Sequence, residues 1–112
     1  MRMIVAIIQP TRLSSVREAL LDAGIEQLTV CDAMGYGRQR GRMASFRGNE
    51  YRVDLLRKIA LEIVVPEDQV EATVDLICRA ARTGSEGEIG DGKIFLMPVA
   101  AGVDLATRPE FL

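Results

Sequence analysis

The sequence predicts one α+β domain of the double βαβ type, with an antiparallel sheet and both helices on one face. Two observations predict this fold class. Short runs rich in Ile and Val alternate with patterns of helical period, and the order strand, helix, strand occurs twice along the chain. The chain has 112 residues and is 48% hydrophobic, which suits a single compact domain over residues 1–112 and is too apolar for a disordered chain.

Four segments have the composition of strands. Met3–Gln9 is a continuous apolar run, typical of a buried central strand, and Leu28–Ala33 is rich in β-favouring residues. Ile59–Val65 alternates apolar with other residues until Pro66 ends it. Lys93–Met97 supplies the fourth strand.

Two helices are predicted between these strands. Ser15 and Glu18 form a capping-box pair, and apolar residues follow at helical spacing until Gly24, which predicts a helix over Leu13–Ala23. An apolar face that follows an acidic first turn predicts a second helix over Glu67–Arg82. Together with the four strands, these helices give the order of a ferredoxin-like sheet.

Charge and composition exclude several classes of function. The formal net charge is -2, whereas proteins that coat nucleic acid carry an excess of Lys and Arg, so no nucleic-acid partner is expected. The chain has no His, and its two cysteines, Cys31 and Cys78, are too few for a zinc site, so neither a metalloenzyme nor a His-based triad is expected. Both cysteines lie in apolar patterns, which predicts reduced cysteines packed in the core.

The distribution of apolar residues also bears on location and assembly. The first apolar run is broken by Pro10 and is too short for a signal segment or a membrane span, so we expect a cytoplasmic protein. Because a domain this small leaves much of its surface in water, we also expect it to form oligomers.

The second and third strands are separated by a long connection, Met34–Leu55. It carries many charges and little apolar periodicity, which predicts a loop, and loops of this length in small domains are usually either functional or disordered. Its arginines, and aromatic residues such as Phe46 and Tyr51, are of types enriched at contact sites. We therefore predict a functional loop.

Two glycine-rich segments partly match phosphate-binding motifs. Gly87–Lys93 has the spacing of a phosphate loop, but a helix precedes it, a strand follows it, and Ile94 stands where Ser or Thr is required. Gly35–Gly41 misses the dinucleotide fingerprint, and either segment alone is better explained by ordinary turn glycines. Together they lie at the same end of the sheet, where glycine N–H groups and Lys93 suit an anion. Because the second and fourth strands of a ferredoxin-like sheet form opposite edges, neighbouring subunits would have to close such a site.

Five strings of residues are distinctive: Gly35–Gly41, Arg47–Tyr51, Leu61–Val65, Ala80–Gly84 and Ile89–Phe95. They closely resemble the PII signal-transduction family, and the match covers about Met1–Val99. The resemblance implies a homotrimer of ferredoxin-like subunits, with ATP or ADP bound in each cleft between subunits and 2-oxoglutarate sensed together with magnesium and ATP. It also implies a T-loop at about 36–55, a B-loop at about 82–93 and a C-terminal tail at about 99–112.

The resemblance assigns ligand-binding roles to particular positions. The implied nucleotide-binding residues are Thr29, Gly35, Gly37, Arg38, Gln39, Val64, Gly90, Asp91, Gly92 and Lys93. Thr29 and Val64 match residues around the adenine and ribose, and Lys93 is expected to make the strongest phosphate contact. Gln39 also matches the residue that helps to hold magnesium and 2-oxoglutarate, and Lys58 matches the lysine that pairs with the 2-oxoglutarate carboxylate.

The same resemblance implies how the protein signals. The T-loop would dock onto target proteins, usually transporters or enzymes of nitrogen metabolism. Tyr51 matches the tyrosine that is uridylylated in many bacterial members, whereas Asn49 stands where some members carry a phosphorylated serine.

Two departures from the family pattern affect the phosphate site. Ser85–Glu88 occupies the place of one Lys and adds two carboxylates, and Asp104 and Ala106 stand where the family carries two arginines that clamp the phosphates. Each lost charge-assisted contact costs about 1.5 to 3 kcal/mol. We therefore expect weakened ATP binding, a preference for ADP or AMP and weak coupling to 2-oxoglutarate, with Arg108 compensating in part from the tail.

Three alternatives stay open. A slow ATPase would use the same loops, although a chain without His and without a placed carboxylate nucleophile has little to activate water, so we expect no enzyme. A nucleic-acid binder using the Arg-rich loop would lose affinity steeply with salt. A divergent sensor of another pathway, such as inorganic-carbon uptake or another metabolite, would keep the nucleotide site but serve other targets.

Overall fold

The computed structural model describes residues 1–40, 51–84, 86–88 and 90–106. Its strands and helices are β1 (Arg2–Ile8), α1 (Leu13–Asp22), β2 (Thr29–Arg40), β3 (Tyr51–Val65), α2 (Val70–Ala81) and β4 (Gly92–Pro98). Short 3-10 turns, Pro10–Arg12 and Glu67–Gln69, precede the two helices. The four predicted strands and two predicted helices are all present, which confirms the α+β class.

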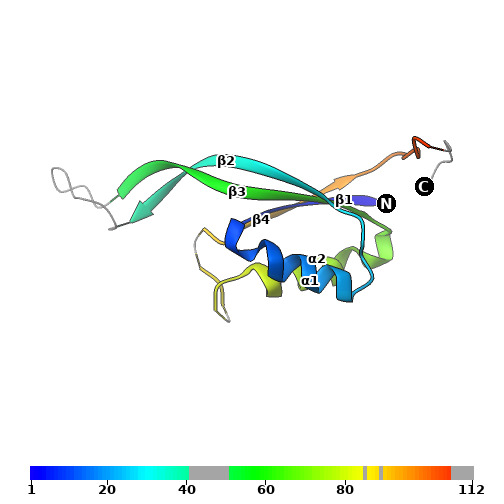
Figure 1. The fold of residues 1–112 in the computed structure, drawn as a ribbon, viewed down its shortest axis with the longest axis horizontal. Coiled ribbons are helices and arrows are strands. Elements are labelled where there is room, and N and C mark those ends of the chain that lie inside the picture. Colours follow the sequence, from blue (N-terminus) through cyan, green and yellow to red (C-terminus); the bar gives the residue numbers. More distant parts are fainter. Residues whose placement is uncertain (41–50, 85, 89, 107–112) are drawn as a thin grey trace.

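The four strands form one antiparallel sheet in the order β2-β3-β1-β4. Ile8 of β1 pairs with Ile59 of β3 on one side and with Gly92 of β4 on the other, and Asp32 of β2 pairs with Ile59. β1 is therefore an inner strand, and β2 and β4 are opposite edges, as predicted. Both helices cover the same face of the sheet (Figure 1).

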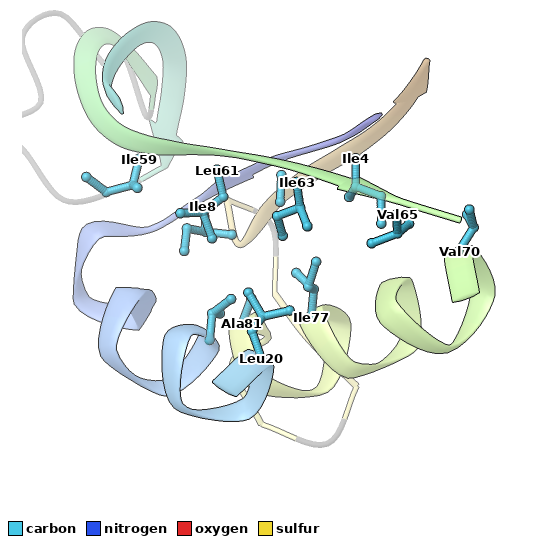
Figure 2. Packing of buried hydrophobic residues seen from close by; sticks show 12 residues of the cluster. Ile4, Ile8, Leu20, Ile59, Leu61, Ile63, Val65, Val70, Ile77 and Ala81 are labelled. Carbon is cyan, nitrogen blue, oxygen red and sulfur yellow. The ribbon is translucent and has the colours of Figure 1, made fainter. Parts of the chain in front are cut away.

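The hydrophobic core lies between the sheet and the two helices. Alternate residues of β1 and β3 face the helices, and Figure 2 shows them packed against the inner faces of α1 and α2. The buried apolar residues are Ile4, Ala6, Ile8, Val16, Leu20, Ile59, Leu61, Ile63, Val65, Val70, Ile77 and Ala81. These residues form a single cluster.

The opposite face of the sheet carries apolar side chains that no helix covers. Val64 is 42% exposed, Phe95 53% and Met97 40%, and the strand register puts all three on this face, which we call the bare face. Cys31 pairs with Ala60 on the same face and is exposed, whereas Cys78 is half-buried. The prediction of two core cysteines was therefore wrong for Cys31, because an apolar stretch of a strand that is covered on one face only still points half of its side chains outward.

The long connection between the second and third strands is mostly strand. β2 continues to Arg40 and β3 begins at Tyr51, so the predicted loop Met34–Leu55 was wrong for residues 34–40 and 51–55. Residues 41–50 lie outside the described part of the chain. The two strands bond to one another, so their pairing does not depend on an apolar face and leaves no periodicity in the sequence. The hairpin projects from the sheet (Figure 1) and raises the radius of gyration to 17.0 Å, against about 13 Å for a compact chain of this length.

The ends of α1 illustrate one wrong and one confirmed prediction. Arg12 precedes the helix and no side chain caps it, so the predicted capping box of Ser15 and Glu18 does not form. The 3-10 turn that starts at Pro10 leads directly into the helix instead. Gly24 does end the helix, with a φ of 85°, and its amide bonds to the Leu21 carbonyl at 2.9 Å. Neither helix in the described ranges has the length and apolar character that crossing a bilayer requires.

Candidate functional site

The loop between α2 and β4 folds around the carboxylate of Asp91. Oδ2 accepts hydrogen bonds from the backbone amides of Thr83 (2.8 Å) and Glu88 (2.7 Å). Oδ1 accepts from the Thr83 hydroxyl (2.7 Å) and from Nε2 of Gln9 (3.2 Å), which follows β1. One side chain thus connects the end of α2, the extra residues of the loop and the end of β1.

These hydrogen bonds also set the protonation of Asp91. Donation from the Thr83 amide and hydroxyl, and then from the Glu88 amide, lowers the pKa of Asp91 below its usual range. Partial burial opposes this shift, and the charge of Arg12 adds to it weakly. The Asp91 carboxylate of the folded protein is therefore ionised at neutral pH.

Two glycines beside Asp91 have backbone angles that other residues rarely adopt. Gly90 has a φ of 96° and Gly92 a φ of 130°. A Cβ on Gly92 would also overlap the backbone carbonyl of Ile7, so the β1–β4 pairing needs glycine there. Lys93 follows, exposed and paired with Ile7. The glycines and the lysine are suited to present N–H groups and a cation to an anion.

Lys58 links this loop to the base of the hairpin. Its Nζ donates a hydrogen bond to the Gly90 carbonyl at 2.6 Å, and Nε2 of Gln9 donates to the same carbonyl at 3.3 Å. Lys58 pairs with Ala33 of β2, so Gly35 lies only two residues further along the hairpin. The structure thus brings Lys58 to the loop of Gly90–Lys93 and puts the two glycine segments at the same end of the sheet, as predicted.

A hollow of about 490 Å³ lies between this loop and the C-terminal half of α2. Val74 and Cys78 of α2 line it, together with Gly92 and Lys93 of β4. Glu86 and Glu88, from the extra residues of the loop, line the same hollow. The carboxylates that distinguish this loop therefore lie near the candidate anion site.

Thr29 and Val64 lie in a second hollow at the other end of the sheet. This hollow has a volume of about 470 Å³ and is lined by Met1, Glu26, Gln27, Leu28, Thr29, Glu62 and Val64. Thr29 begins β2 and pairs with Glu62, two residues from Val64 in β3. The two residues matched to the adenine and ribose thus share one hollow.

One chain does not bring the two groups of predicted residues together. Thr29 is on the edge strand β2, whereas Gly92 and Lys93 are on the opposite edge strand β4. Three inter-strand spacings separate these edges, which is about 14 Å. A single chain therefore keeps the two groups apart.

The remaining predicted residues lie on the hairpin and the tail. β2 carries Gly37, Arg38 and Gln39 beyond Gly35, and Tyr51 begins β3 opposite Arg40. The side chains of residues 36–40 and 51–55 lie outside the described part of the structure. So do Asn49, Ser85 and Arg108, so the predictions made for them stay predictions.

The positions matched to the two family arginines lie after β4, at the end of the sheet remote from the Gly90–Lys93 loop (Figure 1). The Asp104 carboxylate accepts a hydrogen bond from the Ala106 amide at 2.9 Å. This segment therefore begins far from the loop of its own chain.

Two residues at the loop, Gln9 and Thr83, were assigned no role from the sequence, although Thr83 lies within the string Ala80–Gly84. Gln9 reaches Asp91 and Gly90 from the end of β1, and Thr83 donates to Asp91 twice. Their role depends on tertiary proximity, so nothing in the local pattern indicated it.

Comparisons with known proteins identify relatives of the whole chain. The family model described as Nitrogen regulatory protein P-II matches residues 1–108. Nitrogen regulatory protein P-II 1 of Escherichia coli (strain K12) is 49% identical over 110 residues, which cover 98% of this chain and 96% of that protein. Nitrogen regulatory protein P-II of Synechocystis is 49% identical over 107 residues, covering 96% and 93%. The crystal structure of Arabidopsis thaliana PII bound to citrate superposes with a TM-score of 0.77 at 37% identity, covering 97% of this chain and 86% of that one.

Proposed function

The chain belongs to the nitrogen regulatory protein P-II family and is a signalling protein, and we propose that it binds an adenine nucleotide between the subunits of a homotrimer. The observation that carries this proposal is the division of the site. A loop with N–H donors and Lys93 lies at one edge of the sheet, and the Thr29 and Val64 hollow lies near the other. A cyclic assembly would join the loop of one subunit to the hollow of the next.

The chemistry of the two halves suits a nucleotide. Gly90 and Gly92 leave backbone N–H groups unobstructed beside the Lys93 ammonium, a combination that favours phosphate. The Thr29 hollow offers apolar wall and polar edges for a base and a ribose. In this proposal Gly35, Gly37 and Arg38 also contact the nucleotide.

The second proposed effector is 2-oxoglutarate. Lys58 is half-buried and its described partner is the neutral Gly90 carbonyl, so its ammonium is available to a carboxylate. Gln39 would hold magnesium between the nucleotide phosphates and 2-oxoglutarate.

The changes around the loop favour a ligand of lower charge. Glu86 and Glu88 line the same hollow as Lys93, and their negative charges repel the negative charges of a polyphosphate. Asp104 and Ala106 supply no cation where the family has arginines. We therefore expect ADP or AMP to bind better than ATP, with weak coupling to 2-oxoglutarate.

The bare face of the sheet supports the proposed assembly. Val64, Phe95 and Met97 expose apolar side chains on this face, and contact with a neighbouring subunit would remove them from water. In this proposal the T-loop hairpin stays outside the trimer and docks onto a target, either a transporter or a regulatory enzyme in the cytoplasm, with uridylylation of Tyr51 as a switch.

Titration calorimetry with ATP, ADP and AMP tests the nucleotide site. Lys93→Ala should weaken binding roughly tenfold or more, because it removes a charge-assisted contact. Arg79→Ala, which removes an exposed cation from the last turn of α2, is the matched control and should leave binding unchanged. Absence of nucleotide binding to the unaltered protein would refute the proposal, and tight ATP binding that 2-oxoglutarate strengthens would refute the expected preference for ADP or AMP.

The alternatives predict different measurements. A slow ATPase would release phosphate over many turnovers and lose this activity in Lys93→Ala, whereas a sensor binds without sustained turnover. A nucleic-acid binder would show affinity that falls steeply with salt and is independent of nucleotide. A sensor of another pathway would bind nucleotide normally but capture targets outside nitrogen metabolism.

A further inference from the structure

We propose that Asp91 is a positioning residue, whose carboxylate holds the Gly90–Lys93 loop in its ligand-ready shape without contacting the ligand itself. This inference rests on the proposed function, because it specifies how the phosphate half of that site is built. It assigns Asp91 a different role from Lys93, although the two lie side by side in the sequence.

The first argument is that the carboxylate has no free acceptor site. An ionised carboxylate offers about four lone-pair sites. Four donors occupy them: the amides of Thr83 and Glu88 on Oδ2, and the Thr83 hydroxyl and the Gln9 amide on Oδ1. A ribose hydroxyl or another ligand donor would have to displace one of these bonds.

The second argument is what the four bonds join. Thr83 follows α2, Glu88 belongs to the lengthened part of the loop, and Gln9 follows β1. A turn in which the Asp91 amide donates to the Glu88 carbonyl at 3.2 Å closes the same ring of contacts. We call this set of contacts the Asp91 staple.

The third argument is that the loop needs such a restraint. Gly90 and Gly92 flank Asp91 with positive φ angles, and glycine loses more backbone freedom on ordering than any other residue. A loop ordered before the ligand arrives spares the ligand that cost. The staple therefore contributes to affinity through pre-organisation.

The two possible roles of the Asp91 carboxylate, a nearby negative charge and a positioning group, predict opposite effects when its charge is removed. If Asp91 acted only as a nearby negative charge, Asp91→Asn would strengthen the binding of an anion. Under the proposal Asp91→Asn weakens ADP binding roughly tenfold or more, because an amide cannot accept from four donors. Glu86→Gln removes an exposed carboxylate from the same loop and is the matched control, with ADP binding at least as tight as in the unaltered protein.

Substitutions at Thr83 distinguish positioning from direct contact. Thr83→Val keeps the shape of the side chain and the backbone amide but removes the hydroxyl donor, so it should weaken ADP binding severalfold. Thr83→Ser keeps the hydroxyl and should bind ADP as tightly as the unaltered protein. ADP binding to Asp91→Asn that equals or exceeds that of the unaltered protein would overturn the proposal. So would weak binding in Asp91→Asn combined with unchanged binding in Thr83→Val, because Asp91 would then contact the ligand directly.

Amide hydrogen exchange gives a readout that needs no ligand. The Glu88 and Thr83 amides should exchange at least tenfold faster in Asp91→Asn, and their exchange rates should be unchanged in Glu86→Gln. Core amides of β1 and β3 should stay protected in both variants, which would show that the variants fold. Unchanged exchange at Glu88 in Asp91→Asn would overturn the staple. If the unaltered protein binds neither ADP nor ATP, the proposed function fails, and this exchange measurement still decides whether the staple exists.

Discussion

At the scale of single residues, Gly92 is a position where the backbones of β4 and β1 lie too close together for a side chain. Its φ of 130° is unfavourable for any side chain, and a Cβ would overlap the Ile7 carbonyl. We predict that Gly92→Ala lowers the free energy of unfolding by roughly 2 to 4 kcal/mol. Gly35→Ala is the control, because a Cβ there meets nothing within 4 Å, and it should change stability by less than about 0.5 kcal/mol. Urea denaturation at one fixed protomer concentration measures both, and equal effects would contradict the prediction.

The protonation of Asp91 gives a second prediction at this scale. Its folded-state pKa is lowered, so its contribution is complete above the ordinary value of 3.8 and is lost as the pH falls through the lowered value. We expect the Glu88 amide to stay protected from pH 7 to about pH 4 and to lose protection only in more acid solution. NMR titration of the Asp91 carboxyl carbon should give a midpoint below 3.8. A midpoint at or above that value would show that the hydrogen bonds to Asp91 are not formed in solution.

The sequence predicted single residues correctly where the backbone conformation of that residue alone determines its role. It failed where the role depends on contacts with other parts of the chain. Gly24 was predicted to end α1, and it does so with a positive φ. Ser15 and Glu18 matched a capping box, but the turn at Pro10 starts the helix earlier. Gln9 could not be predicted at all, because its partners are about 80 residues away in the sequence.

At the scale of elements, α2 holds the sheet through the side chain of Ile77, which is fully buried (Figure 2). We predict that Ile77→Ala lowers the free energy of unfolding by about 2 to 5 kcal/mol, and Ile77→Val by about 0.5 to 1.5 kcal/mol, in proportion to the volume removed. Glu71→Ala, on the exposed side of the same helix, should change it by less than about 0.5 kcal/mol. Thermal or urea unfolding followed by circular dichroism measures the series. A cost for Ile77→Val as large as that for Ile77→Ala would contradict a simple packing role.

The elements were predictable to the extent that they bury a face. β1, α1, α2 and the inner part of β3 each pack apolar side chains into the core, and each left a periodic pattern in the sequence. The outer parts of β2 and β3 bury no such face and are joined by backbone hydrogen bonds, which any sequence supplies. The predicted loop therefore became a hairpin.

At the scale of the whole molecule, the exposed apolar residues of the bare face are an argument for assembly. We predict that Phe95→Glu converts the proposed trimer to monomers, because burial of an unpaired carboxylate opposes association. Leu21→Glu is the matched control: Leu21 is 43% exposed on α1, on the helical side of the molecule, and its replacement should leave the trimer intact. Native mass spectrometry gives the oligomeric state and circular dichroism checks the fold. A trimer that survives Phe95→Glu would exclude the bare face as the interface.

The binding site illustrates what a sequence can and cannot indicate about such an assembly. The resemblance to the PII family implied roles for Lys58, Gly90 and Lys93, which lie together, and for Thr29 and Val64, which share another hollow. The sheet order then shows that the two groups lie at opposite edges of one chain. Local patterns contain no information about this separation, because it arises from topology.

A mixing experiment tests whether two subunits share each nucleotide site. Lys93→Ala subunits lack the phosphate contact, so their homotrimer should bind ADP only weakly. Thr29→Trp subunits have a filled hollow, so their homotrimer should not bind ADP. In a ring where the loop of each subunit faces the hollow of the next, every mixed trimer contains one junction between an intact loop and an intact hollow. Refolding the two variants together in equal amounts should therefore restore about one quarter of the unaltered binding capacity, at unaltered affinity. Native mass spectrometry confirms that mixed trimers form, and calorimetry counts the sites. If mixed trimers form but bind no ADP, each site is contained within one chain and the proposed shared cleft is wrong.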